Sequence, residues 1–266
     1  MKARFLAVLF MTICTQISVA QYTYNKLVWQ DEFNGNGLLP DTAKWSYDTG
    51  NGCPVICGWG NNELQCYLAN RKENARTENG FLIIEAHKEN GCGKGYTSAR
   101  MTTRNKADWT YGRFEIRAKL PSGKGIWPAI WMLPVRSEYG IWPHSGEIDI
   151  MENVGYMPDS VFGTVHTGAF NGMLETQKSK GIYQDDLTQS FHNYGVEWTT
   201  DRITFFFDGY AYFDFKRMPG SDCWPFDKAF YLILNVAVGG NWGGKYGVDE
   251  SIFPQKLLVD YVRVFQ

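Results

Sequence analysis

The chain has 266 residues, with 26 basic and 28 acidic side chains, a formal net charge of −2 and 20% charged residues. This balance excludes both the basic face that binds nucleic acid and a polybasic segment that attaches a protein to a membrane surface. Aromatic residues make up 16% of the chain, and there are 28 glycines. Such a composition excludes disorder, and it favours short strands joined by tight turns over a helical bundle.

Residues 1–20 have the pattern of a secretory signal peptide. A basic start is followed by an apolar run and by Ser18-Val19-Ala20, a small-x-small cleavage site. The apolar run is too short for a spanning helix, and no later run is long enough. We therefore expect a secreted protein, extracellular or periplasmic, with no membrane partner. Residues 21–266 are expected to form one domain.

Five of the six cysteines lie after the predicted signal peptide: Cys53, Cys57, Cys66, Cys92 and Cys223. An exported protein can form disulfides, and an odd number of cysteines leaves at least one thiol free or paired between chains. We expect one or two disulfides in loops, with the connectivity left open. The cysteine and histidine spacings do not fit a zinc site.

Short strand-like runs follow one another along the chain, at residues 81–87, 111–120, 129–133, 147–151, 162–166, 194–198, 203–207, 230–236 and 257–265. Apolar and charged residues alternate over 113–120, which predicts a half-buried strand. Asp208-Gly209 follows one of these runs and predicts a hairpin turn. No segment has a long helical period. The sequence therefore predicts an all-β fold, an antiparallel sandwich.

Residues 146–152, Gly-Glu-Ile-Asp-Ile-Met-Glu, place three acids on one predicted strand. Glu147 and Asp149 share one face, because side chains alternate along a strand. Strict alternation would turn Glu152 into the core, where an unpaired carboxylate is costly. A one-residue bulge at Ile150–Met151 returns Glu152 to the acidic face. All three carboxylates then line one surface.

Paired carboxyl groups on one surface suit retaining glycoside hydrolysis, in which one is the nucleophile and the other the acid/base. We expect Asp149, between the two glutamates, to raise the pKa of whichever one must hold a proton. Two interpretations without catalysis stay open at this point. A strand with acids on its outer face need have no function, and three carboxylates are also suitable calcium ligands.

Three tryptophans, Trp127, Trp131 and Trp142, precede the acidic strand and are interrupted by prolines. Indole rings are flat apolar surfaces on which the C–H faces of sugar rings can stack. Aromatic rings beside paired acids therefore favour a sugar-binding surface. For each tryptophan taken singly, packing in the core is the alternative.

Residues 146–152 resemble the E-x-D-x-x-E signature of glycoside hydrolase family 16, in the bulged form found in laminarinases. Further segments resemble the family in order: 59–65, 111–115, 125–134, 142–143, 191–192, 197–198, 235–244 and 260–264. The resemblance covers about residues 26–266. It implies a concanavalin A-like β-jelly roll of two curved antiparallel sheets, with an open substrate cleft on the concave face.

The resemblance also implies the roles of the acids. Glu147 would be the nucleophile, Asp149 an assisting acid and Glu152 the general acid/base. The implied activity is endo-hydrolysis of β-1,3-glucans such as laminarin, with retention and with no cofactor for catalysis. The implied substrate-binding residues are Asn61, Arg100, Trp127, Trp131, Trp142 and His166. The local match at His166 is weaker, and a histidine merely bonded at a strand end is the alternative.

The resemblance further implies one structural calcium ion on the convex side, held mostly by backbone oxygens at Glu32, Gly80 and Asp260. We expect a monomer. A non-catalytic β-glucan-recognition protein on the same fold is an alternative, although such modules typically lose the acids that are present in this chain. A specificity for mixed-linkage β-1,3-1,4-glucan, agarose or carrageenan also stays open. The bulge argues against typical mixed-linkage enzymes. A charge of −4 after residue 20 argues weakly against sulfated substrates.

Overall fold

The computed structural model describes residues 22–266, so the predicted signal peptide lies outside the described residues. Nearly all regular structure is strand, and two antiparallel sheets contain most of it. Sheet A has the order β15 (Tyr210–Lys216), β14 (Arg202–Phe207), β13 (His192–Trp198), β8 (Gly112–Lys119), β17 (Gln255–Phe265), β5 (Phe81–Ala86) and β4 (Ala75–Glu78). In addition, β1 (Leu27–Asp31) pairs with β17.

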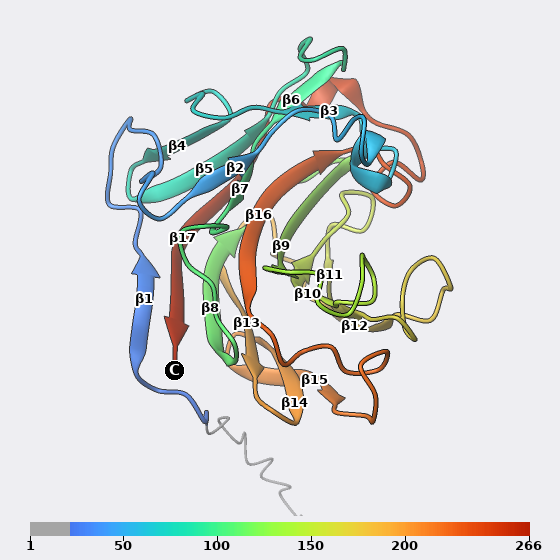
Figure 1. Ribbon diagram of the computed structural model, residues 1–266. Coiled ribbons are helices and arrows are strands. Elements are labelled where there is room, and N and C mark those ends of the chain that lie inside the picture. Colours follow the sequence, from blue (N-terminus) through green and yellow to red (C-terminus); the bar gives the residue numbers. More distant parts are fainter. Residues whose placement is uncertain (1–21) are drawn as a thin grey trace, which may run out of the picture.

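Sheet B carries the acidic strand near its middle. Its order is β12 (Lys178–Tyr183), β11 (Ser160–His166), β10 (Glu147–Glu152), β9 (Ile126–Pro134), β16 (Phe230–Val238), β7 (Arg100–Thr102) and β2 (Ser46–Asp48). A small parallel pair consists of β3 (Gln65–Tyr67) and β6 (Tyr96–Ser98). Figure 1 shows the two large sheets curving together, with sheet B on the inner side of the curve.

The core lies between the two sheets, and sequence alternation determines which side chains enter it. On β8, Phe114, Ile116 and Ala118 are buried in the core, while the charged residues between them face outward, as predicted. The central strand β16 is buried along its whole length, because sheet A covers one face and neighbouring side chains cover the other. The predicted all-β sandwich is therefore confirmed.

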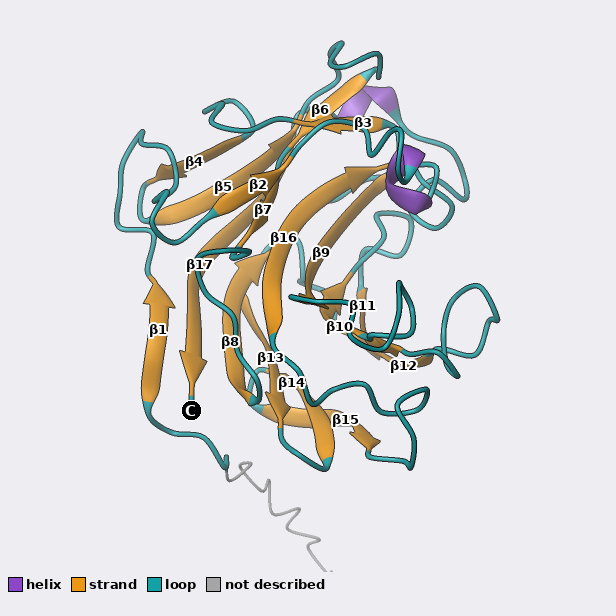
Figure 2. Ribbon diagram, in the orientation of Figure 1, coloured by secondary structure: helices purple, strands orange, loops and turns teal. Residues whose placement is uncertain are grey.

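The turn predicted at Asp208-Gly209 joins β14 to β15. Both residues have positive φ, 47° and 81°, and Phe207 pairs with Tyr210 across the turn. This is the backbone of a two-residue hairpin, for which Asp-Gly is a favoured sequence. Two short helical segments occur in the described chain, and Figure 2 shows both in purple. They are η1 (Cys57–Gly60), in which Gly58 and Trp59 have positive φ, and η2 (Glu250–Ile252), a single 3-10 turn. Over residues 22–266, no helix has the length and apolar character needed to cross a membrane.

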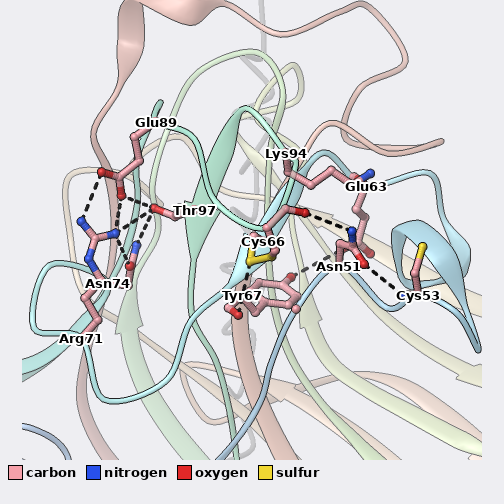
Figure 3. Close-up of a disulfide and its surroundings, with 12 residues drawn as sticks. Asn51, Cys53, Glu63, Cys66, Tyr67, Arg71, Asn74, Glu89, Lys94 and Thr97 are labelled. Carbon is pink, nitrogen blue, oxygen red and sulfur yellow. Dashed lines mark hydrogen bonds and ion pairs between the residues drawn. A yellow bond between two sulfur atoms is a disulfide. The ribbon is translucent and has the colours of Figure 1, made fainter.

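Two disulfides are present, in agreement with the expectation of one or two. Cys53 bonds to Cys57 within one loop, and Cys66 of β3 bonds to Cys92, 26 residues further along the chain. Figure 3 shows the second bond beside Tyr67. Within the described chain, Cys223 is the one cysteine outside these bonds.

Candidate active site

The three acids lie on β10, between β9 and β11. Asp149 pairs with Thr164 of β11 and Glu152 pairs with Phe162, so three steps along β10 match two along β11. The pairing of β10 with β9 is shifted at the same place. This is the predicted bulge, and it gives β10 one extra residue relative to its neighbours.

The bulge decides which side chains of β10 enter the core. Ile148, Ile150 and Met151 are all buried in the hydrophobic core between the sheets. Glu152 is therefore not turned inward, as strict alternation would require, and it lies on the same face as Glu147. The prediction of one acidic face on β10 is confirmed.

Each glutamate receives a hydrogen bond from a different tryptophan. Trp142 Nε1 donates to Glu147 Oε2 at 2.7 Å, and Trp127 Nε1 donates to Glu152 Oε1 at 3.1 Å. Trp127 belongs to β9, whereas Trp142 lies in the loop before β10 and is 41% exposed. The two indoles therefore hold the two carboxyl groups from opposite directions along β10.

Glu152 is in surroundings that favour its protonated form. Burial is the largest effect and the charge of Glu147 the second, and together they raise the pKa of Glu152 to about 8. The hydrogen bond from Trp127 opposes this shift. A carboxylic acid that keeps its proton at neutral pH is suited to donate it to a leaving group.

Asp149 is the most buried of the three acids, with 2% exposure. Burial, followed by the charges of Glu147 and Glu152, raises the pKa of Asp149 well above its usual range. The raised pKa expected for the acid that holds the proton agrees with Glu152, for which burial and then the charge of Glu147 are the causes. Asp149 is itself driven toward its neutral form.

His166 lies opposite Glu147 in the pairing of β10 with β11. Its Nδ1 accepts a hydrogen bond from the backbone N–H of Gly172 at 3.2 Å, so the neutral ring carries its proton on Nε2. That nitrogen is 3.4 Å from Asp149 Oδ2 and 4.0 Å from Glu147 Oε1. His166 therefore belongs to the acidic site.

The side chains of Glu147, Asp149 and His166 each offer one atom within 4.8 Å of the others. Among the described residues this is the only group of three or more His, Cys, Asp or Glu side chains arranged closely enough to hold a metal ion. It mixes an imidazole with two carboxyl groups, one of them favouring its neutral form. Calcium prefers six to eight oxygen ligands, so the set does not match the calcium alternative.

A second group of predicted substrate-binding residues begins on β9, where Trp131 pairs with Asp149, and extends across sheet B to Arg100 on β7. The Arg100 guanidinium is 4.6 Å from the ring centroids of both Trp59 and Trp131. Arg100 Nε is also 3.1 Å from Asp48 Oδ2. Trp131 Nε1 donates to Asn235 Oδ1 at 2.7 Å, which directs the polar edge of the indole toward β16.

Asn61 follows η1 and is joined to two neighbours. Its Nδ2 donates to Glu63 Oε1 at 3.4 Å, and its backbone carbonyl accepts from the Asn241 N–H at 2.7 Å. Of the six predicted substrate-binding residues, Trp127, Trp142 and His166 therefore approach the acids directly. Asn61, Arg100 and Trp131 form the second group, and within it Trp131 lies opposite Asp149 in the pairing of β9 with β10.

Several residues near the site were not singled out from the sequence. Trp242 lies with its ring 5.5 Å from Trp127 and 5.4 Å from Phe162, measured between centroids. Trp59 and Asn235 belong to the second group. Trp59, Asn235 and Trp242 lie inside the segments that resemble the family, but spacing along the chain does not distinguish a residue on the active face from one in the core.

The three predicted calcium positions meet at one point on sheet A. Strand β17 pairs with β5 up to Val259 and with β1 from Val262 onward, so Asp260 lies in the gap between β5 and β1. Glu32 directly follows β1, and Gly80 directly precedes β5. The sheet topology therefore brings these residues together from three distant parts of the chain.

The carboxylates of Glu32 and Asp260 already have partners. Arg263 donates to both oxygens of Glu32, at 2.8 and 2.9 Å, and Arg117 forms an ion pair with Asp260. Backbone carbonyl oxygens are then the groups left for a cation, which fits the implied way of holding calcium.

The model of glycosyl hydrolases family 16 matches residues 62–263. The chain belongs to this family.

Family 16 members with known structures resemble the chain over most of its length. A beta-glucanase from Rhodothermus marinus is 55% identical over 249 residues, which cover 91% of this chain and 85% of the relative. The X-ray structure of the laminarinase from Rhodothermus marinus has a TM-score of 0.87 and 54% identity, with 91% and 97% of the two chains covered. SCLam, a non-specific endo-beta-1,3(4)-glucanase from the family, has a TM-score of 0.85 and 49% identity, with 91% of each chain covered. The predicted family and its jelly-roll fold are thereby confirmed.

Proposed function

We propose that this family 16 chain is a retaining endo-hydrolase of β-1,3-glucans of the laminarin type. The observation that carries the proposal is the pairing of two glutamates on one bulged strand. Glu147 faces the substrate side of sheet B with an indole N–H on one oxygen, while Glu152 favours its protonated form beside it. A nucleophilic carboxylate and a neutral acid on the same surface are what double displacement requires.

In the first step, Glu152 donates its proton to the glycosidic oxygen while Glu147 attacks the anomeric carbon. The bond from the anomeric carbon to the leaving oxygen breaks, and a covalent glycosyl-enzyme forms on Glu147. Asp149, driven toward its neutral form, donates a hydrogen bond to Glu147 before attack. His166 keeps its proton, and its Nε2 lies on the same side, 3.4 Å from Asp149 Oδ2.

In the second step, the charge of Glu147 is lost in the ester, so the smaller of the two effects that raise the pKa of Glu152 is removed. Glu152, now ionised, takes a proton from water, and the resulting hydroxide oxygen attacks the anomeric carbon. The ester bond breaks and Glu147 regains its charge. Two inversions at one carbon give net retention of configuration.

The names of the similar proteins support a β-glucan substrate, because they are called beta-glucanase, laminarinase and endo-beta-1,3(4)-glucanase. Tryptophans on the acidic face support a neutral sugar polymer. The third name describes a non-specific enzyme, so we expect slower cleavage of mixed-linkage glucan as a second activity. Catalysis by this residue set requires no cofactor.

The test is a substrate panel of laminarin, curdlan, lichenan, agarose and carrageenan, with reducing ends and product sizes measured. We expect fast release of oligosaccharides from laminarin, with the β-anomer appearing first in proton NMR spectra of fresh product. A folded protein that binds laminarin without releasing reducing ends would show it to be a recognition module. Monosaccharide as the sole product would contradict the endo assignment.

We further propose that the protein is secreted after cleavage behind Ala20 and acts as a monomer. The signal-like pattern of residues 1–20 and the two disulfides of the described chain support export. Mass spectrometry of the exported protein should give an N-terminus at Gln21. Sedimentation should give the mass of one chain.

We also propose a structural calcium ion at Glu32, Gly80 and Asp260. The convergence of these residues at the gap along β17, and the engagement of both carboxylates by arginines, support a site built from carbonyl oxygens. Such an ion would join β1, β5 and β17.

A further inference from the structure

Glu63 is a buried acid that contacts none of the catalytic acids. It lies between η1 and β3 and is 6% exposed. Its Oε2 accepts hydrogen bonds from Gln65 Nε2 at 2.5 Å and from the Tyr67 hydroxyl at 3.4 Å, and its Oε1 accepts from Asn61 Nδ2 at 3.4 Å. Three donors therefore converge on one carboxylate, and Figure 3 shows Glu63 and Tyr67 beside the Cys66 disulfide.

The carboxylate determines the direction of a chain of hydrogen bonds. The Tyr67 hydroxyl has one proton, and when this is donated to Glu63 the oxygen is left to accept. It accepts from Asn235 Nδ2 at 3.1 Å. With its amide nitrogen turned to Tyr67, Asn235 presents its oxygen to Trp131 Nε1, which donates at 2.7 Å. Glu63 therefore fixes the orientation of the Trp131 indole on the active face through its hydrogen bond with Tyr67 and the bonds of Asn235.

The same carboxylate is linked to two further parts of the surface. It holds the nitrogen end of the Asn61 amide, and the Asn61 carbonyl in turn accepts from Asn241, next to Trp242. Arg100 lies over Trp131, and its charge lowers the pKa of Glu63 against the larger effect of burial, which raises it. Glu63 therefore lies behind the group formed by Asn61, Arg100 and Trp131.

We infer that Glu63 is a positioning residue that orients Trp131, on the strand next to β10, and Asn61 to bind the sugar units that extend from the cleaved bond toward β16 and β7. This inference rests on the proposed glucanase function. In sheet B, Asn235 lies two strands and Arg100 three strands from the catalytic strand β10. Long substrates that reach the whole group should benefit most from Glu63, and the shortest cleaved oligosaccharide should benefit least.

The test is Glu63→Gln, assayed on laminari-oligosaccharides from trimer to hexamer. Glutamine has the same size as glutamate, but one of its two terminal groups is an NH2 donor. This donor would face Gln65, Tyr67 or Asn61, which all donate to Glu63, so at least one of these hydrogen bonds is lost or changes direction. We expect kcat/KM for the hexamer to fall by about tenfold or more, mainly through KM, because a buried donor loses its acceptor. The kcat/KM for the trimer should change much less, so the ratio of kcat/KM for the hexamer to kcat/KM for the trimer falls.

Tyr67→Phe is the second variant, because it removes the link to Asn235 and leaves the bonds of Gln65 and Asn61 to Glu63. It should lower the same ratio. Glu85→Gln is the matched control: Glu85 is 5% exposed on β5 of sheet A and pairs with Arg76. We expect it to lower the melting temperature and leave the ratio unchanged.

A folded Glu63→Gln or Tyr67→Phe protein with the wild-type ratio would overturn the inference. So would an equal loss on all chain lengths, which would indicate a general structural role. Titration of tryptophan fluorescence with laminarihexaose separates this outcome from failure of the proposed function. If the wild type binds the hexamer without cleaving it, the glucanase proposal fails. The affinity ratio between wild type and Glu63→Gln then decides the positioning role.

Discussion

Glu147 and Glu152 are chemically identical side chains that the fold places in different surroundings. Both lie on β10 and both receive an indole hydrogen bond. Glu152 also has a pKa raised to about 8 by burial and by the charge of Glu147. This asymmetry supports the proposed roles of Glu152 as acid and Glu147 as nucleophile.

The first prediction concerns pH. Because Glu152 must be protonated to act as general acid, kcat/KM should fall as pH rises through about 8. A pH profile on laminarin checks this directly. Replacing Trp127 by Phe removes a hydrogen bond that lowers the pKa, so the alkaline limb should move to higher pH. A limb that moves to lower pH in that variant would contradict the assignment.

The second prediction concerns stability. A carboxyl group whose pKa is raised on folding stabilises the fold fully below its unfolded pKa and loses that contribution as pH rises through its folded pKa. For Glu152 the window therefore runs from about 4.5 up to about 8. Glu152→Gln, which cannot ionise, should raise the melting temperature relative to wild type more at pH 8 than at pH 5, by about 7–14 °C. If the melting temperatures of Glu152→Gln and wild type differ equally at pH 5 and pH 8, the raised pKa of Glu152 is contradicted.

The third prediction separates the two glutamates by rescue. Glu152→Ala loses acid/base help but keeps the nucleophile, so azide should restore turnover of a substrate with an activated leaving group. The product should be a glycosyl azide of retained configuration, detectable by NMR. Glu147→Gln should lose nearly all turnover while still binding glucan. Substantial activity of Glu147→Gln would refute its role as nucleophile.

At the scale of elements, one irregularity places the third acid. The bulge in β10 lets Ile150 and Met151 both pack in the core while Glu152 stays with Glu147. A regular strand would exchange the positions of Met151 and Glu152. The Cys66–Cys92 disulfide holds β3 in a similar way. Cys66 lies between Gln65 and Tyr67, which both donate hydrogen bonds to Glu63.

The fourth prediction compares the two disulfides. Removing Cys66–Cys92, which closes a 26-residue separation, should cost about 3–4 kcal/mol, against about 2 kcal/mol for the 4-residue Cys53–Cys57 loop, if both act through the unfolded chain. Paired Cys→Ser double variants and urea unfolding give the two values. The Cys66 variant should also weaken binding of long oligosaccharides. Equal destabilisation by both would argue against a loop-length effect.

At the scale of the whole molecule, sheet A is closed by contacts between distant parts of the chain. Strand β17 near the C-terminus pairs with β1, β5 and β8, and the proposed calcium position lies where β1 and β5 both leave it. An ion at that point would stabilise the sandwich without touching the acids on sheet B.

The fifth prediction is a stability change with calcium. An ion that binds only the folded protein, at 100 times its dissociation constant, adds about 2.7 kcal/mol, or about 5–10 °C for a domain of this size. Differential scanning calorimetry in calcium, magnesium and EGTA measures it. Calcium should raise the melting temperature, while kcat at 25 °C stays constant. Identical transitions in all three buffers would exclude the site.

Local patterns were enough to determine several features of this protein. Alternation predicted β8, Asp-Gly predicted the β14–β15 turn, and the cost of a buried carboxylate at Glu152 predicted the bulge, because each depends on residues near one another in sequence. Resemblance to the family added the remaining site residues.

Only the tertiary structure decided how these parts act on one another. It decided the burial of Asp149, which raises the pKa of that carboxyl group, because burial between β9 and β11 cannot be read from one strand. It also revealed the path from Glu63 to Trp131, whose members come from residues 63, 67, 131 and 235. Protonation and orientation depend on desolvation and on partners distant in sequence, and both are created when the two sheets pack together.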